Sequence, residues 1–209
     1  MIKVQHRVNS ITELQQVNKK FGVEIDIRNH GNELLVVHDP FITEGINLSK
    51  WLLDYDHKFL IVNVKEEGLE PQLLETLSNK NINNFFILDE SFPYIRKYAL
   101  AGTSSFALRV SEFESVETAL NLDLDLKKSG NRVGWIWLDT FTGLALPNTD
   151  LKRLREAGFK LCQVSPELHY ISDIDSWESR IREFQKGLAN VRNEGIEIDM
   201  VCTKRPDLW

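Results

Sequence analysis

Two carboxylates and a histidine lie close together in residues 22–40. Residues 23–27 alternate apolar and acidic side chains, and this period of two predicts a β-strand that projects Glu24 and Asp26 from one face. A glycine-containing turn and a second apolar strand then lead to His38. Carboxylate oxygens bind hard divalent cations and histidine transfers protons near neutral pH, so the stretch suits a cation and a proton donor acting on one substrate. The alternative interpretation is a solvated acidic strand edge with a capping histidine.

Polar residues end several other apolar stretches of the chain. They are His6, Arg7, Asn63, Lys65, Asp89, Arg109, Asp139, Ser165 and Glu167. Asn63 and Lys65 are two residues apart, so a strand would present both on the same face. This placement indicates a site, although loop composition alone would produce part of it.

The elements that must position these residues alternate between strand and helix about eight times. Strands are predicted at 3–7, 23–27, 59–65, 85–89, 105–112, 133–139, 159–164 and 196–202. Helices are predicted at 10–21, 47–55, 71–77, 93–98, 116–128, 150–157 and 177–191. The strands are apolar on both faces, which is typical of a parallel sheet covered by helices.

The fold class predicted is therefore α/β, a compact TIM (β/α)8 barrel with residues 1–209 as a single domain and a short or absent final helix. The alternative is a doubly wound open sheet, but no glycine-rich phosphate-binding segment follows the first strand. In a TIM barrel the chemistry lies at the carboxyl ends of the strands. One pocket is then expected to hold His6, Glu24, Asp26, His38, Asn63 and Lys65.

Composition restricts the partners of the chain. It has 209 residues, 42% of them hydrophobic and 27% charged, with a formal net charge of −6. An acidic chain of this kind argues against a general nucleic-acid or anionic-membrane partner. No apolar run has the length of a signal peptide core or a membrane span, so cytoplasmic residence is expected. Cys162 and Cys202 lie in apolar stretches and are expected to be buried free thiols.

Three motifs in the first third of the chain resemble the glycerophosphodiester phosphodiesterases, a family within the phospholipase-C-like phosphodiesterase superfamily of TIM barrels. They are His6-Arg7 after the first strand, Glu24-x-Asp26 on the second, and His38-Asp39 shortly after. Asn63-x-Lys65 occupies the place of the family's Glu-x-Lys. The resemblance implies metal-dependent cleavage of a small glycerophospho- or sugar-phosphodiester.

The resemblance also implies roles for particular residues. Glu24 and Asp26, with Asn63 as the third ligand, would bind Mg²⁺ or Ca²⁺. His6 and His38 would be the acid–base pair, and Arg7 and Lys65 would bind the phosphate. We add Arg109 and Glu167 as substrate- or phosphate-binding candidates because they also lie at strand ends.

The chain departs from the family pattern in ways that indicate a divergent branch. Val8 stands in place of the glycine after His-Arg, and the usual Pro-Glu-Asn-Thr segment is absent. Asn63 replaces an acidic ligand, so the cation is expected to bind weakly. The segment between His38 and Asn63 is too short for the subdomain inserted in many members of the family.

Two other functions compete with this interpretation. A catalytically silent barrel that binds a phosphorylated ligand would explain the loss of an acidic ligand at Asn63. An aldolase-like barrel with Lys65 as a Schiff-base lysine would leave Glu24, Asp26 and the two histidines unexplained. The sequence assigns neither an oligomeric state nor the substrate alcohol.

Overall fold

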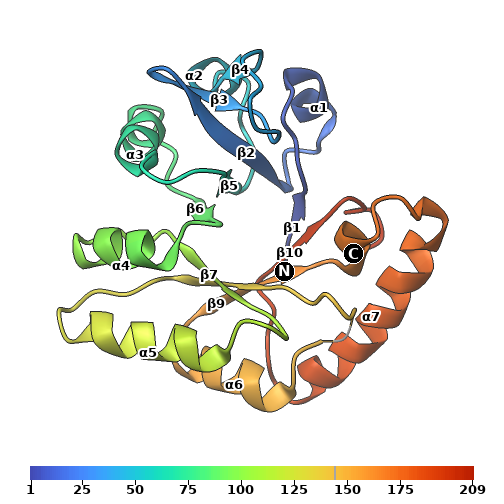
Figure 1. The fold of residues 1–209 in the computed structure, drawn as a ribbon. Coiled ribbons are helices and arrows are strands. Elements are labelled where there is room, and N and C mark those ends of the chain that lie inside the picture. The colour runs from blue at the N-terminus through green and yellow to red at the C-terminus, as the bar shows by residue number, and fades with distance from the viewer. Residues whose placement is uncertain (144) are drawn as a thin grey trace.

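A ring of parallel strands forms the centre of the computed structural model, which describes residues 1–143 and 145–209 (Figure 1). In order around the ring they are β1 (Ile2–Gln5), β2 (Gly22–His30), β5 (Leu60–Val64), β6 (Phe85–Leu88), β7 (Ala107–Val110), β8 (Trp135–Leu138), β9 (Lys160–Val164) and β10 (Met200–Thr203). β10 pairs in parallel with β1, and β1 also pairs with β2. The predicted TIM barrel is confirmed, and the open-sheet alternative is wrong because the parallel strands follow one another in chain order and the last strand, β10, pairs with the first.

The joint between β6 and β7 is the weakest in the described part of the ring. One bridge joins Ile87 to Phe106, and the Ile87 N–H donates to the Ser105 carbonyl at 2.9 Å. By contrast, β2 and β5 share a register of five residue pairs, which sets Asp26 directly beside Asn63. The ring therefore holds the strands of the predicted site firmly together and separates β6 from β7.

Helices surround the outer face of the ring (Figure 1). They are α1 (Ile11–Gln16), α2 (Leu48–Trp51), α3 (Glu70–Asn79), α4 (Phe92–Leu100), α5 (Val116–Lys127), α6 (Asn148–Glu156) and α7 (Trp177–Asn193), with short 3₁₀ turns η1 (Pro166–His169) and η2 (Ile174–Ser176). Two short strands, β3 (Glu33–Val36) and β4 (Ile46–Asn47), extend β2 in an antiparallel direction. Residues 204–209 form turns after β10.

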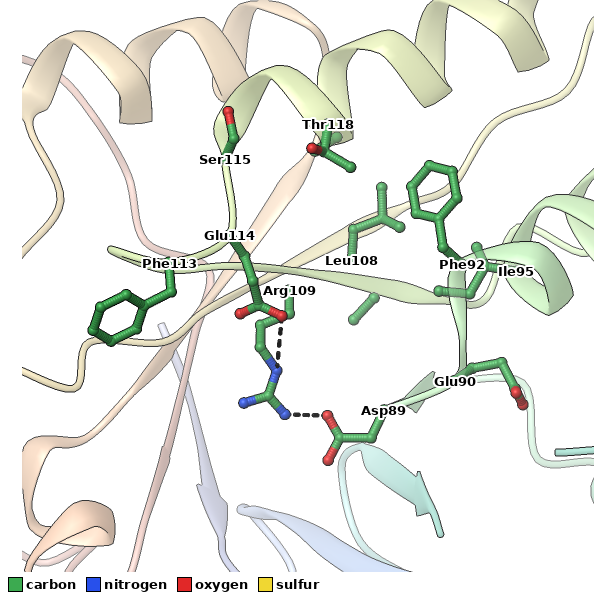
Figure 2. A pocket seen from close by; sticks show the side chains of 12 residues that line it. Asp89, Glu90, Phe92, Ile95, Leu108, Arg109, Phe113, Glu114, Ser115 and Thr118 are labelled. Carbon is green, nitrogen blue, oxygen red and sulfur yellow. Dashed lines mark hydrogen bonds and ion pairs between the residues drawn. The ribbon is translucent and has the colours of Figure 1, made fainter. Parts of the chain in front are cut away.

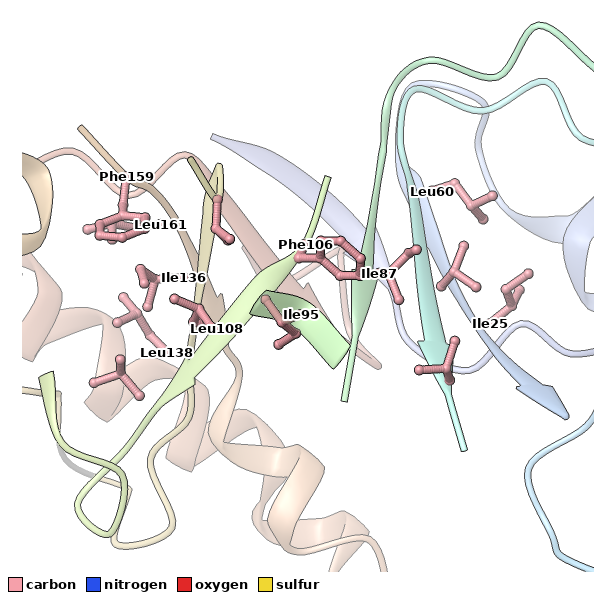
Figure 3. Close-up of a cluster of buried hydrophobic side chains, with 14 of the residues drawn as sticks. Ile25, Leu60, Ile87, Ile95, Phe106, Leu108, Ile136, Leu138, Phe159 and Leu161 are labelled. Atoms are coloured by element: carbon pink, nitrogen blue, oxygen red, sulfur yellow. The ribbon is translucent and has the colours of Figure 1, made fainter. Parts of the chain in front are cut away.

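Alternation along each strand divides the apolar side chains between two cores. The larger core lies between the strands and the helices and includes Ile25, Leu60, Phe106 and Leu138 (Figure 3). The smaller core includes Trp135 and Trp137, whose positions alternate with Ile136 and Leu138 on β8, and the free thiols Cys162 and Cys202. Both thiols are fully buried, as predicted. None of the helices in the described residues is both long and apolar enough to cross a membrane.

Several predicted boundaries need correction. The capping box of Ser10 and Glu13 forms, but the helix stops at Gln16 because the chain turns at 18–21, where the Phe21 N–H donates to the Asn18 carbonyl. The helix predicted at 47–55 is the single turn α2. β2 continues to His30, since its last residues pair with β3. The helix at 116–127 is confirmed despite its alternating leucines.

Candidate active site

Asp26 is the centre of a polar cluster at the carboxyl end of the strands. Its side chain is 1% exposed and faces the barrel interior, because its apolar neighbours on β2 pack outward. Oδ1 lies 3.1 Å from Lys65 Nζ, and Oδ2 lies 3.4 Å from Arg7 Nε. Asn9 Nδ2 donates to Oδ2 at 2.8 Å, and the Asp26 backbone N–H donates to Asn9 Oδ1 at 3.0 Å. One buried carboxylate thus orients two positive side chains.

Glu24 lies one strand step before Asp26 and is fully buried. The Arg7 backbone N–H donates to Glu24 Oε2 at 2.6 Å, and His6 Nε2 lies 3.7 Å from the same oxygen. Arg7 has a φ of 53°, so the loop turns sharply directly after His6. Burial, followed by the nearby Asp26 charge, raises the pKa of Glu24 to about 8. At neutral pH Glu24 therefore carries a proton unless a further positive charge is present.

His6 is held neutral by its surroundings. Burial, followed by the positive charges of Lys204 and Arg7, lowers the pKa of His6 to about 3. Lys204 Nζ donates to the His6 carbonyl at 2.8 Å, and the three residues line a cavity of about 400 Å³ beside α1. Sequence reasoning missed Lys204, although its place directly after the last predicted strand was a usable signal. Two positive side chains next to a neutral imidazole favour an anionic ligand.

Glu24, Asp26 and Asn63 are brought together on β2 and β5, as the predicted cation site requires. Glu24 Oε1 and Asn63 Oδ1 are buried oxygens without a hydrogen-bond partner, and such oxygens suit a hard cation. Both oxygens of Asp26 already have partners, so Asp26 joins them only by releasing Lys65 or Asn9. Within residues 1–143 and 145–209 no group of three or more His, Cys, Asp or Glu side chains is arranged for a metal. Glu24 Oε1 and Asn63 Oδ1 are therefore the two oxygens of this set that would contact a cation without giving up a present partner.

His38 reaches the same end of the barrel. The preceding Val37 N–H donates to the Asp26 carbonyl at 3.0 Å, and the His38 carbonyl accepts a hydrogen bond from Arg28 Nε at 2.9 Å. His38 Nδ1 lies 2.8 Å from Asp39 Oδ1, so the exposed Asp39 carboxylate orients the ring. The side chain of His38 is 37% exposed, whereas that of His6 is 14% exposed. The two histidines differ clearly in their exposure to solvent.

Arg109 belongs to a second polar cluster across the mouth. Its guanidinium pairs with Asp89 and lies 2.6 Å from Asp139 Oδ2 and 3.8 Å from Glu114 Oε1. His169 Nε2 lies 2.6 Å from Asp139 Oδ1. Three carboxylates around Arg109 offset its positive charge. To bind a phosphate, as predicted, Arg109 would have to exchange one of these carboxylates for it. Motif spacing did not reveal the His169–Asp139 contact.

Glu167 needs correction as a candidate for substrate binding. Its side chain is fully buried and accepts hydrogen bonds from the hydroxyl groups of Ser165 and Thr203 and from the Lys204 backbone N–H at 2.9 Å. These contacts join the η1 turn to the end of β10. Glu167 therefore stabilises the contact between η1 and β10, and we remove it from the candidate site.

Comparisons with known proteins give a match of fold. The sequence matches no known protein family and no curated protein. A glycerophosphoryl diester phosphodiesterase from Parabacteroides distasonis superposes with a TM-score of 0.65 at 12% identity, over 99% of this chain and 84% of that one.

Two structures from Agrobacterium tumefaciens agree with this match. A putative glycerophosphoryl diester phosphodiesterase has a TM-score of 0.64 at 12% identity and covers 100% of this chain and 95% of its own. A glycerophosphodiester phosphodiesterase has a TM-score of 0.64 at 14% identity and covers 100% of this chain and 98% of its own. The expected likeness to these barrels is therefore present in the fold.

Proposed function

We propose that this chain is a phosphodiesterase that cleaves a small glycerophospho- or sugar-phosphodiester. The observation that carries the proposal is the set of contacts around one buried carboxylate pair: Arg7 and Lys65 on Asp26, and His6 beside Glu24. Two cationic groups and a histidine at the mouth of this barrel suit an anionic phosphoryl group and a proton transfer. The shared fold with three phosphodiesterase structures supports the same reaction class.

In this proposal positive side chains bind the phosphate. Asp26 fixes the direction of Arg7 and Lys65 before substrate arrives, so little reorganisation is needed when charge develops on the phosphoryl oxygens. Lys204 adds a third positive charge beside His6 and has no carboxylate within ion-pair distance among the described contacts. A bound phosphoryl group would offset these charges.

In this proposal His6 and His38 transfer the protons. His6 is neutral and accepts the proton of the attacking hydroxyl or water as the new P–O bond forms. Its basicity rises when the phosphoryl anion offsets Arg7 and Lys204, because their charges are part of what lowers its pKa. His38, as an imidazolium whose Nδ1–H donates to Asp39, donates its Nε2 proton to the departing alcohol oxygen.

We further propose that a divalent cation, Mg²⁺ or Ca²⁺, binds weakly at Glu24, Asp26 and Asn63. When bound it would supply positive charge to the phosphoryl oxygens and favour the ionised form of Glu24. In this proposal the cation adds to phosphate binding by Arg7 and Lys65 and to proton transfer by His6 and His38.

Turnover of bis(4-nitrophenyl) phosphate tests the proposal, with Mg²⁺ or Ca²⁺ added and then removed by chelator. We expect His6→Ala and His38→Ala each to lower turnover by about 10²-fold or more, the usual range for loss of an acid–base group. His30→Ala, at an exposed position on the β2–β3 hairpin, is the matched control and should retain full activity. Full activity in both test variants would show that the histidines do not act in the reaction.

A catalytically silent barrel that binds a phosphorylated ligand is the second candidate function. The contacts of Asp26 favour this second candidate. Lys65, Arg7 and Asn9 already occupy both carboxylate oxygens of Asp26, and a carboxylate whose oxygens are occupied is a poor metal ligand. Phosphate binding without turnover at any divalent cation concentration would support this candidate over the enzyme.

A further inference from the structure

A cleft of about 510 Å³ opens at the carboxyl ends of β6 and β7, next to the candidate active site (Figure 2). Its apolar walls include Phe92, Ile95, Leu108 and Phe113. Figure 2 shows Phe92 and Phe113 on either side of Leu108 and Arg109. A space of this size and lining is ordinary for a small-molecule subsite.

The cleft exists because β6 and β7 separate after their single bridge. Beyond Ile87 and Phe106 the two strands share no further paired residues in the described chain. β6 ends at Leu88, and Asp89 turns away from the strand with a φ of 62°. β7 continues to Val110, so α4 and α5 enclose the space between them.

The charged groups of the cleft are mostly committed to one another. Asp89 and Glu114 both pair with Arg109, as Figure 2 shows. The Glu90 side chain points away from Arg109 in the same view. Phe92 and Phe113 are 40% and 78% exposed, so their rings are available for contact. The surface left for a ligand combines the apolar side chains with the polar groups of Glu90, Ser115 and Thr118.

Asp89 links the lining of the cleft to the candidate phosphate site. Asp89 Oδ2 lies 3.8 Å from Lys65 Nζ, and Lys65 contacts Asp26. A phosphoryl group bound by Lys65 would therefore place one of its two ester substituents at the entrance of the cleft.

We propose that this cleft binds the apolar body of one alcohol substituent of the diester, an aryl or branched aliphatic group. The inference rests on the proposed function, because it places the phosphate at Arg7 and Lys65. It narrows the substrate class to diesters with one apolar alcohol, which Phe92 and Phe113 would flank.

Isothermal titration calorimetry with methyl phosphate and phenyl phosphate tests the inference. The two probes carry the same phosphate and differ in apolar surface. We expect the native protein to bind phenyl phosphate about tenfold more tightly, given the apolar area that a phenyl ring buries. Thr118→Phe fills the cleft from an exposed position on α5 and should abolish this preference without weakening methyl phosphate. Phe113→Ala should reduce the preference several-fold.

Asn121→Phe is the matched control, since it adds the same ring at an exposed α5 position outside the cleft lining. It should leave both affinities unchanged. Equal binding of the two probes by the native protein, or an equal loss of both in Thr118→Phe, would overturn the cleft inference and leave the phosphate site standing. If neither probe binds, the phosphate site of the proposed function is wrong and the inference fails with it.

Discussion

Glu24 and Asp26 are two residues apart on the same face of β2 but have different surroundings. Asp26 has a partner on each oxygen, including two positive side chains. Glu24 has a backbone donor on one oxygen and none on the other, and its pKa is raised to about 8. Burial, followed by the Asp26 charge, therefore decides the ionisation of Glu24. Asn63, opposite Asp26, adds an oxygen but no charge.

Asn63→Glu should tighten Mg²⁺ or Ca²⁺ binding, because affinity for a hard cation increases with the number of charged ligands. We expect an increase of about tenfold in the association constant, measured by calorimetric titration. Asn63→Gln is the matched control, since it adds the same methylene without the charge.

Equal affinities in the glutamate and glutamine variants would show that position 63 is not beside the cation, or that no cation site exists. Turnover is a separate readout, since tighter binding raises the rate only if the transition state gains more than the ground state.

At the scale of elements, two further buried acidic side chains lie at the start of α3 and in the loop before α4. Glu70 begins α3 and is fully buried, and Glu90 follows β6 and is 8% exposed. Burial, followed by Glu70, raises the pKa of Glu90 to about 8. The folded protein thus holds the Glu90 proton more tightly than the unfolded chain does. The stabilising contribution of this proton is complete below about pH 4.5 and is lost as the pH rises toward 8.

Glu90→Gln should therefore stabilise the protein at pH 9 and change little at pH 4.5. We expect the free energy of unfolding at pH 9 to rise by about 1–3 kcal/mol, since the variant removes a poorly partnered buried charge. Urea unfolding at the two pH values measures this. Glu67→Gln, at an exposed position nearby, should show no such dependence. A parallel pH profile for Glu90→Gln and the native protein would contradict the assignment.

At the scale of the whole molecule, the number of paired residues between neighbouring strands differs around the barrel. β2 and β5 share five residue pairs, whereas β6 and β7 share one bridge. Side-chain packing must therefore replace hydrogen bonds at that joint. Phe106 is fully buried there, in the core between strands and helices (Figure 3).

Phe106→Ala should lower the free energy of unfolding by about 3–5 kcal/mol, the usual loss when a buried phenyl ring leaves a cavity. Phe41→Ala, at a position that is 99% exposed, is the control and should change it by less than about 0.5 kcal/mol. Denaturant unfolding measures both. A loss below about 1 kcal/mol for Phe106→Ala would show that packing of this ring does not hold the joint.

Local sequence determined the elements and the face on which their polar residues lie. Apolar runs of strand length, the capping box at Ser10 and the two-residue spacing of Glu24 and Asp26 depend on neighbouring residues alone. The same spacing rule placed Asn63 and Lys65 beside them, because parallel strands end at one edge of a barrel. These features needed no knowledge of distant contacts.

Only the tertiary structure decided what each polar side chain contacts. Glu167 has the sequence position of a site residue, but Thr203 and Lys204 from the far end of the chain bury it as a structural carboxylate. Lys204 reaches His6 across nearly the full length of the sequence. The cleft between β6 and β7 likewise follows from how the strands pair. Burial and charge pairing depend on residues distant in sequence, so local spacing alone does not determine them.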